Sequence, residues 1–318
     1  MIPAVTRRGR AGPRPADRPP DVWQKLLAGV LAGSVVATTP ATEVERNVVY
    51  GMVSGTALLL DVHHPAPATT RHRGVLFVPG SGWYADRRYD APALKDMQSG
   101  WEPGDRLARA MVSQLTDAGF TVFVTNHRAA PAFRYPAAIE DLARAVAFVR
   151  MHADRFGVDA TRLGGVGTSS GGNLVSLLGS DDRLPTDSHV DAVVTLGSPM
   201  DMVAMFESAD TSAAALVTWI GHGIAFLPPD HPEVETWRRA GTSGHASKGD
   251  APHLIVHGSD DELVPLQQAE VMHRRWQALG VPTGLVVIEG GGHSERLFGD
   301  GAPWLERMTE FLGEHLGA

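Results

Sequence analysis

The chain contains no cysteine, which excludes disulfide bonds, a thiolate nucleophile and cysteine-ligated zinc. It also lacks an excess of positive charge. The 28 lysines and arginines stand against 36 aspartates and glutamates, for a net charge of −8, so we expect no nucleic-acid partner. Histidines and carboxylates do not occur at the spacings of known metal motifs, including His-Glu-x-x-His, so we expect neither a metal nor another cofactor.

Residues 1–44 differ in composition from the rest and are predicted to form an N-terminal arm. The first twenty residues hold five arginines and five prolines, and an uncharged apolar run follows at residues 26–37. This run is too short for a stable membrane span. A basic region before an apolar run is also typical of a signal peptide, although Asp17 and Asp21 are unusual in one. We therefore expect a cytoplasmic protein, with secretion through an N-terminal signal peptide as the alternative.

Residues 45–318 have the length and apolar content of one large domain. Strand-like apolar runs alternate with stretches of helical spacing, which predicts a mostly parallel sheet of eight strands with helices on both faces. The first two strands read as a hairpin around Ser54-Gly55. The later strands are expected at 74–78, 120–125, directly before Gly167, and at 190–196, 253–257 and 283–288. The helices are expected at 105–118, 136–156, after Gly172, and at 265–279 and 303–316.

A long insertion at about 199–250 interrupts this alternation. It contains methionines and aromatic residues at helical spacing, among them Met202, Phe206 and Trp219. One interpretation is a small helical lid that contributes these three side chains to an apolar substrate site. The other is an excursion of the chain that only packs on the core, because such residues at helical spacing are usually core.

The pattern Gly-x-Ser-x-Gly occurs at Gly167, Ser169 and Gly171, after an apolar strand and before a helix. This pattern is typical of a nucleophile elbow, in which a serine projects from a tight, strained turn. Small residues on either side let the strand and the helix approach closely. The N–H of Ser170 would then begin the helix and face a negatively charged oxygen of the substrate. The alternative is an ordinary turn rich in glycine and serine.

A serine nucleophile needs a general base and an acid that orients the base. His293 follows the last expected strand in a glycine-rich loop, and Asp261 follows the strand before it. The chain order Ser169, Asp261, His293 is the order of the α/β-hydrolase triad, and the carboxyl ends of parallel strands meet at one edge of a sheet. Three other carboxylates compete for the acid role, namely Asp260, Glu262 and Asp201.

Four stretches resemble the esterase/lipase branch of the α/β-hydrolase superfamily, in particular the groups of hormone-sensitive lipase and of bacterial feruloyl and acetyl esterases. The resemblance covers roughly residues 45–315. The stretches are Asn126-His127-Arg128-Ala129-Ala130-Pro131, residues 135–141, residues 167–173 and residues 257–265. The last is similar to the pattern His-Gly-x-x-Asp-x-x-Val-Pro, which favours Asp261 as the acid.

The resemblance implies roles for single residues. Ser169 would be the nucleophile and His293 the base, and the amides of Ser170, Ser81 and Gly82 would bind the oxyanion. Residues 79–83 correspond to the His-Gly-Gly-Gly-Trp loop of the family, with proline in place of the histidine and serine in place of one glycine. Trp83 and Tyr84, directly after this loop, are predicted to line the substrate pocket.

These features together predict a metal-free serine carboxylesterase with an α/β-hydrolase fold. Its partner would be a small-molecule ester with a short to medium acyl chain or an aryl group, cleaved through an acyl-enzyme. Two alternatives remain. One is a peptidase or amidase similar to prolyl oligopeptidase, although no propeller precedes the domain. The other is a hydrolase fold that only binds a ligand, although such a protein would tolerate the loss of Ser169 or His293.

Overall fold

The computed structural model describes residues 43–85, 93–97, 104–207, 234–293 and 302–317. The expected N-terminal arm lies outside these residues except at its end, and so does the middle of the expected lid, residues 208–233. Across the described ranges, every helix is too short or too polar to cross a membrane.

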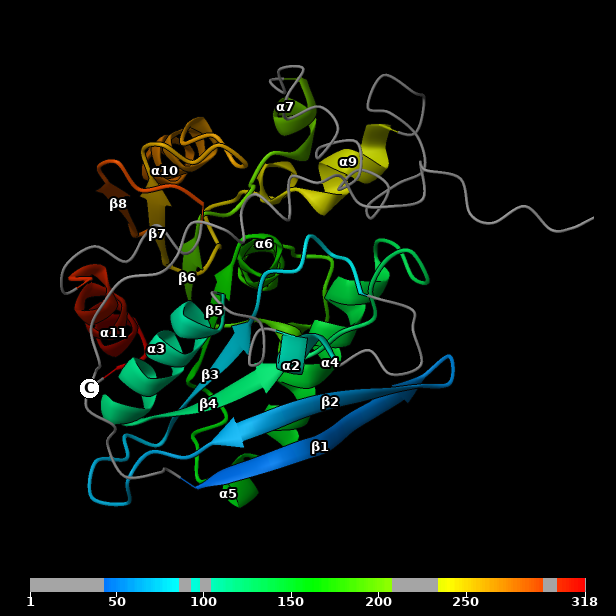
Figure 1. The fold of residues 1–318 in the computed structure, drawn as a ribbon, viewed down its shortest axis with the longest axis vertical. Coiled ribbons are helices and arrows are strands. Elements are labelled where there is room, and N and C mark those ends of the chain that lie inside the picture. The colour runs from blue at the N-terminus through cyan, green and yellow to red at the C-terminus, as the bar shows by residue number, and fades with distance from the viewer. Residues whose placement is uncertain (1–42, 86–92, 98–103, 208–233, 294–301, 318) are drawn as a thin grey trace, which may run out of the picture. The chain divides into compact units, whose positions relative to one another are not determined.

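Eight strands of the described chain form one sheet in the order β1-β2-β4-β3-β5-β6-β7-β8 (Figure 1). β1 and β2 pair antiparallel, β2 runs antiparallel to β4, and the other neighbours pair in parallel. The mostly parallel eight-stranded sheet predicted from the sequence is therefore confirmed. The strands are β1 (Val44–Val53), β2 (Thr56–His63), β3 (Arg73–Val78), β4 (Phe120–Thr125), β5 (Leu163–Thr168), β6 (Ala192–Leu196), β7 (His253–Gly258) and β8 (Thr283–Ile288).

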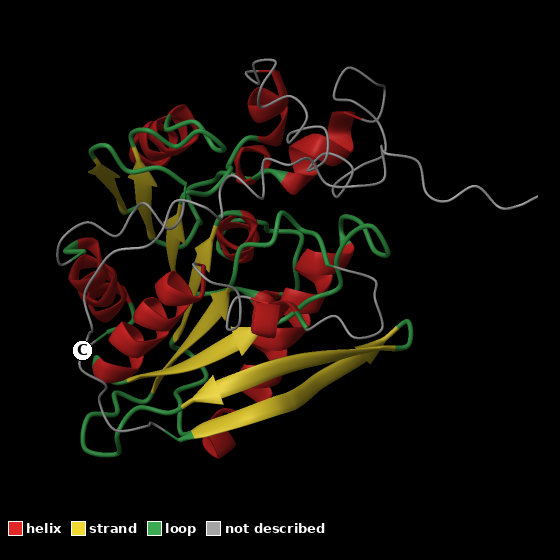
Figure 2. Ribbon diagram, in the orientation of Figure 1, coloured by secondary structure: helices red, strands yellow, loops and turns green. Residues whose placement is uncertain are grey.

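Helices cover both faces of this sheet (Figure 2). The longer ones are α3 (Gly104–Asp117), α4 (Ala137–Met151), α6 (Ser170–Leu178), α10 (Gln267–Leu279) and α11 (Trp304–His315). The short ones are α2 (Leu94–Met97), α5 (Ala153–Phe156), α7 (Met202–Glu207) and α9 (Val234–Ala240).

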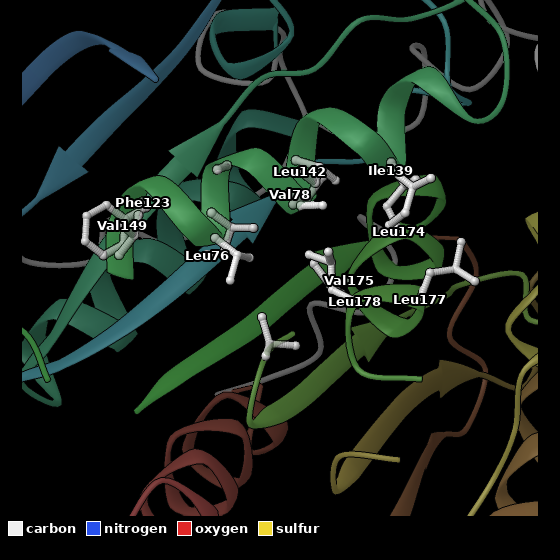
Figure 3. Close-up of a cluster of buried hydrophobic side chains, with 14 of the residues drawn as sticks. Leu76, Val78, Phe123, Ile139, Leu142, Val149, Leu174, Val175, Leu177 and Leu178 are labelled. Carbon is white, nitrogen blue, oxygen red and sulfur yellow. The ribbon is translucent and has the colours of Figure 1, made fainter. Parts of the chain in front are cut away.

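One face of the sheet packs against α4 and α6. Residues Ile139, Leu142 and Val149 recur along α4 at helical spacing and are buried, so they form one apolar face of that helix. This face and the leucines of α6 contact β3 and β4, as Figure 3 shows for Leu76 and Phe123. The packing fixes α6, and thus Ser169 at its start, over the middle of the sheet.

The opposite face packs against α3 and α11. Successive residues of a strand point to opposite faces. Leu76 of β3 therefore belongs to the cluster with α4, while Val75 and Phe77 pack with Met111 of α3 and Met308 of α11. β3 is buried on both faces, which explains its continuous apolar run.

The helix predicted over 136–156 is divided in the structure. α4 ends at Met151 and α5 begins at Ala153, because the backbone of His152 leaves the helical region (φ −109°, ψ 23°). The apolar period continues across the break and no glycine or proline marks it, so the local pattern does not indicate where the helix ends.

Candidate active site

Ser169 lies in the sharp turn between β5 and α6. Its backbone is strained, with φ at 50° and ψ at −125°, a region that non-glycine residues rarely adopt. A Cβ atom on Gly167 would overlap the backbone of Gly171, and one on Gly171 would overlap the carbonyl oxygen of Val78. Both glycines are therefore required by the close approach of strand and helix, and the strained turn lifts the Ser169 hydroxyl out of the sheet edge.

The structure brings Ser169, His293 and Asp261 into one hydrogen-bonded chain. The Nε2 atom of His293 lies 3.0 Å from Ser169 Oγ, and its Nδ1 atom lies 2.8 Å from Asp261 Oδ2. Ser169 follows β5, Asp261 follows β7 and His293 follows β8, so the three meet because parallel strands end at the same edge.

Asp261 is buried but ionised. Burial opposes its charge, yet His293 and the hydrogen bonds that the carboxylate accepts outweigh burial and lower the pKa of Asp261. The amides of Leu263 and Val264 donate to Oδ1 at 2.9 and 2.8 Å. An ionised carboxylate only accepts hydrogen bonds, so the proton between the residues belongs to His293 Nδ1. In the neutral imidazole, Nε2 then carries no proton and can accept that of Ser169.

The loops that carry the acid and the base are joined to each other. The N–H of Ser259 donates to Ile288 O at 3.0 Å, and the N–H of Asp260 donates to Gly291 O at 2.8 Å. The side chain of Ser259 in turn accepts from the N–H of Gly290 at 2.8 Å. These bonds hold the two loops as a unit, so the spacing of Asp261 and His293 does not depend on side-chain contact alone.

The rival carboxylates lie elsewhere. Asp201 caps the start of α7, where its Oδ1 accepts from the N–H of Ala204 at 2.9 Å. Asp260 accepts the hydroxyl of Ser259 and is exposed. The hydrogen bonds of His293 Nδ1 go to the two oxygens of Asp261.

The loop after β3 differs from expectation in one contact. The N–H of Ser81, predicted as an oxyanion donor, donates to the side-chain Oγ of Ser170 at 2.9 Å. The N–H of Gly80 donates to Thr168 Oγ1 at 2.9 Å. The N–H of Gly82 donates to no described residue. The N–H of Ser170 lies at the first position of α6, where the helix dipole favours negative charge.

A buried ion pair supports this loop from behind. Arg128 binds Asp141 of α4 through two nitrogens, each 2.8 Å from a carboxylate oxygen, and Asp141 is fully buried. The pair holds the following residues, where Ala130 N donates to Trp83 O at 2.8 Å and Ala85 N donates to Ala130 O at 2.9 Å. The stretch 126–141 therefore positions the loop that carries Gly82 and Trp83.

A small cavity lies beside the first turns of α6. Its lining is aromatic or apolar apart from two arginines and an asparagine. The lining residues are Trp83, Arg128, Ala129, Phe133, Arg134, Tyr135, Ala138, Asn173, Leu174 and Ala240. The N–H of Asn173 donates to Ser169 O at 3.1 Å, which places the cavity one helical turn from the serine.

The five predicted pocket residues fare differently. Trp83 lines the cavity, whereas Tyr84 does not and forms a bridge with Ala130. Met202 is buried in the core cluster that includes Trp237. The side chain of Phe206 and the whole of Trp219 lie outside what the structure describes. Most of the lining comes instead from 128–138, the connector after β4 and the start of α4, which the sequence does not mark as a pocket.

Two residues near the triad escape sequence reasoning. Gly197 follows β6 with φ at 54°, and a Cβ atom there would lie 3.3 Å from Asp261 Oδ2 and 3.5 Å from His293 Nδ1. A glycine directly after a strand is a weak signal for such a position. His257 lies fully buried with Nε2 3.5 Å from Asp261 Oδ2. It is the first residue of the pattern that favours Asp261 as the acid, but that pattern does not indicate this contact.

The sheet order, the strained serine between β5 and α6 and the chain of three side chains define an α/β-hydrolase fold of the esterase/lipase type. Solved structures share this fold. A truncated carbohydrate esterase from gut microbiota superposes with a TM-score of 0.67 at 25% identity, over 87% of this chain and 98% of its own. An esterase of Thermogutta terrifontis superposes with a TM-score of 0.64 at 21% identity, over 86% and 94% of the two chains.

The chain belongs to the BD-FAE family, whose sequence profile it matches over residues 60–276. Among curated proteins it is similar to esterase LipC of Mycobacterium tuberculosis, with 30% identity over 85% of this chain and 64% of the relative. It is also similar to an ethyl acetate hydrolase of Pseudomonas putida, with 27% identity over 63% and 65% of the two chains. The chain thus spans less than two thirds of the length of these relatives.

Proposed function

We propose that this protein is a serine hydrolase that cleaves small carboxylic esters through an acyl-enzyme. The observation that carries the proposal is the hydrogen-bonded chain from Ser169 Oγ through His293 to Asp261, with distances of 3.0 and 2.8 Å. The ester class follows from the similarity to proteins named as esterases and as an ethyl acetate hydrolase.

In the first half of the reaction, His293 Nε2 accepts the proton of Ser169 as Oγ attacks the ester carbonyl carbon. The C–O bond to the alcohol then breaks, and His293 returns the proton to the departing oxygen. In the second half, a water molecule loses a proton to His293 and attacks the acyl carbon. The bond from that carbon to Oγ then breaks, His293 returns the proton to Ser169 Oγ, and the acid is released. Asp261 keeps its charge throughout and stabilises the imidazolium that forms twice.

The oxyanion of each tetrahedral intermediate would accept from the amides of Ser170 and Gly82. Both are backbone donors at fixed positions, and one such donor typically contributes on the order of 10²–10³ in kcat. The Ser81 amide donates to Ser170 Oγ instead. In this chain we therefore assign it to anchoring the loop on α6, and not to binding the oxyanion.

The apolar walls near Ser169 favour acyl chains of limited length. Trp83, Phe133 and Leu174 line the cavity, together with Arg128, whose guanidinium binds the buried Asp141. Each methylene buried there would stabilise binding by about 0.8 kcal/mol, or about fourfold in affinity. We expect kcat/KM to rise from nitrophenyl acetate toward the butyrate or hexanoate and then to fall once the cavity is full.

The test compares a series of nitrophenyl esters with the matched anilides. The nitrophenolate of these esters leaves with little help, whereas an amine must be protonated by His293 in a tightly held geometry. The anilides are therefore expected to react slower by orders of magnitude. Equal kcat/KM for a peptide anilide and for the butyrate ester would overturn the proposal in favour of a peptidase.

A fluorophosphonate probe tests the nucleophile. Labelling should map to Ser169 and disappear in Ser169→Ala, together with turnover. Ser113→Ala is the matched control, because Ser113 is exposed on α3 and its hydroxyl donates to Asp117 of the same helix. Labelling that persists in Ser169→Ala would rule out this serine as the nucleophile.

A further inference from the structure

A second histidine lies against the acid of the triad. His257 is the penultimate residue of β7, and its side chain is fully buried. Its Nε2 atom lies 2.8 Å from the carbonyl oxygen of Val264 and 3.5 Å from Asp261 Oδ2. The reaction steps above make no use of this ring, so its burial beside an ionised carboxylate needs another explanation.

The contacts of His257 define its protonation. A carbonyl oxygen only accepts hydrogen bonds, so the 2.8 Å contact requires a proton on Nε2. The Nδ1 atom is buried and has no partner among the described residues. Burial lowers the pKa of His257, which leaves the ring neutral with its single proton on Nε2. This proton faces Val264 O and, at longer range, the Asp261 carboxylate.

Val264 is held on both sides of its backbone. Its carbonyl oxygen accepts from His257, while its N–H donates to Asp261 Oδ1 at 2.8 Å. The turn from β7 to Val264 is therefore closed at its start and at its end, with Asp261 in the middle. The amides of Leu263 and Val264 hold Oδ1, and the carboxylate fixed in this way faces His293 Nδ1 with Oδ2 at 2.8 Å and Oδ1 at 3.0 Å.

We propose that His257 is a positioning residue for the reaction: by holding Val264 O, it fixes the turn in which Asp261 orients His293. This inference rests on the proposed function for its kinetic consequences, but not for its geometry. A neutral donor suits the role, because a charged group at this place would compete with His293 for the carboxylate.

The test uses two variants that both carry a side-chain amide as hydrogen-bond donor but differ in the length of the side chain. In His257→Gln, the amide nitrogen is as many bonds from Cα as Nε2 of the histidine, so it can still donate to Val264 O. In His257→Asn, the amide nitrogen is one bond closer to Cα and falls short. We expect His257→Asn to lower kcat on nitrophenyl butyrate by about tenfold to a hundredfold, the size typical of a small misplacement of a catalytic group. KM should stay within about twofold, and His257→Gln should recover most of kcat.

The pH profile adds a readout that general loss of stability would not move. A misplaced Asp261 stabilises the His293 imidazolium less, so the acid limb of kcat/KM should shift to lower pH in His257→Asn and return in His257→Gln. Equal losses in both variants, through kcat or through folding, would overturn the positioning role.

A measurement without turnover separates this inference from the proposed function. The proton on His293 Nδ1 should give a low-field NMR resonance because it is bonded to Asp261, and His293→Ala identifies it by removing it. The resonance should shift or broaden in His257→Asn and remain in His257→Gln. An unchanged resonance in both would refute the inference even if the wild-type protein hydrolyses esters. A changed one would support it even if no ester is cleaved.

Discussion

Acidification should destabilise the protein through a buried histidine that links the nucleophile helix to β7. His253 is fully buried, accepts the hydroxyl of Ser176 from α6 at 3.1 Å, and donates from Nδ1 to Ala251 O at 2.6 Å. Its ring stacks on Trp276 with centroids 3.9 Å apart. Burial, only partly offset by these hydrogen bonds, lowers the pKa of His253 to about 4.

The direction and size of this loss of stability follow from the difference between the pKa of His253 in the folded and in the unfolded chain. The unfolded chain binds the proton with a pKa of about 6.5, so stability is complete above that value and is lost as the pH falls toward 4. A difference of about 2.5 units corresponds to about 3 kcal/mol once both states are protonated. At pH 5 the loss should be about 2 kcal/mol of the free energy of unfolding.

Urea unfolding at pH 7.5 and pH 5, with wild type and His253→Gln, measures this loss. The variant has no titrating group at 253, so all other ionisations cancel when the two pH differences are subtracted. The wild type should lose about 2 kcal/mol more than the variant on acidification. Equal losses in the two proteins, or a larger loss in the variant, would refute a neutral buried His253.

Three further outcomes concern the active site. Asp261→Asn should lower kcat by up to about 10⁴ by allowing the wrong tautomer of His293, while Asp201→Asn should matter far less because Asp201 caps α7; the reverse order would move the acid. Gly197→Ala should lower kcat, because the added carbon would crowd Asp261 and His293, and should lower the free energy of unfolding by about 1–2 kcal/mol, because φ is 54°. Full activity of this variant would contradict the prediction. Ser170→Ala should lower kcat by about tenfold at similar KM through loss of the bond to the Ser81 amide; a higher kcat would instead make the freed amide an oxyanion donor.

Several features of the structure could be predicted from local sequence patterns alone. The eight strands and the longer helices follow from apolar runs and helical spacing, since burial on one or two faces imposes those periods on any chain. The tight turn at Ser169 and the strand ends before Asp261 and His293 were also predictable, because glycines and the end of an apolar run mark such places in the sequence. The division of α4 from α5 at His152 could not be predicted, because no residue type marks it.

The choice among neighbouring carboxylates shows where local reasoning becomes weak. Asp260, Asp261 and Glu262 are adjacent, and the preference for Asp261 came from a resemblance rather than from chemistry. In the structure, two amides of the same turn donate to Asp261 Oδ1 and hold the carboxylate with both oxygens within 3.0 Å of His293 Nδ1. Side-chain direction within a turn depends on its backbone angles, which residue types alone do not specify.

The sequence by itself determined the sheet, its covering helices and the position of Ser169, because each depends on residues close to one another in the chain. Only the tertiary structure decided what surrounds the serine. The Ser81 amide meets a hydroxyl 89 residues away, Gly197 lies against Asp261 and His293, and the cavity is lined from 128–138 as well as from α6. Such contacts join segments that approach one another when the strands align, and no local spacing encodes them.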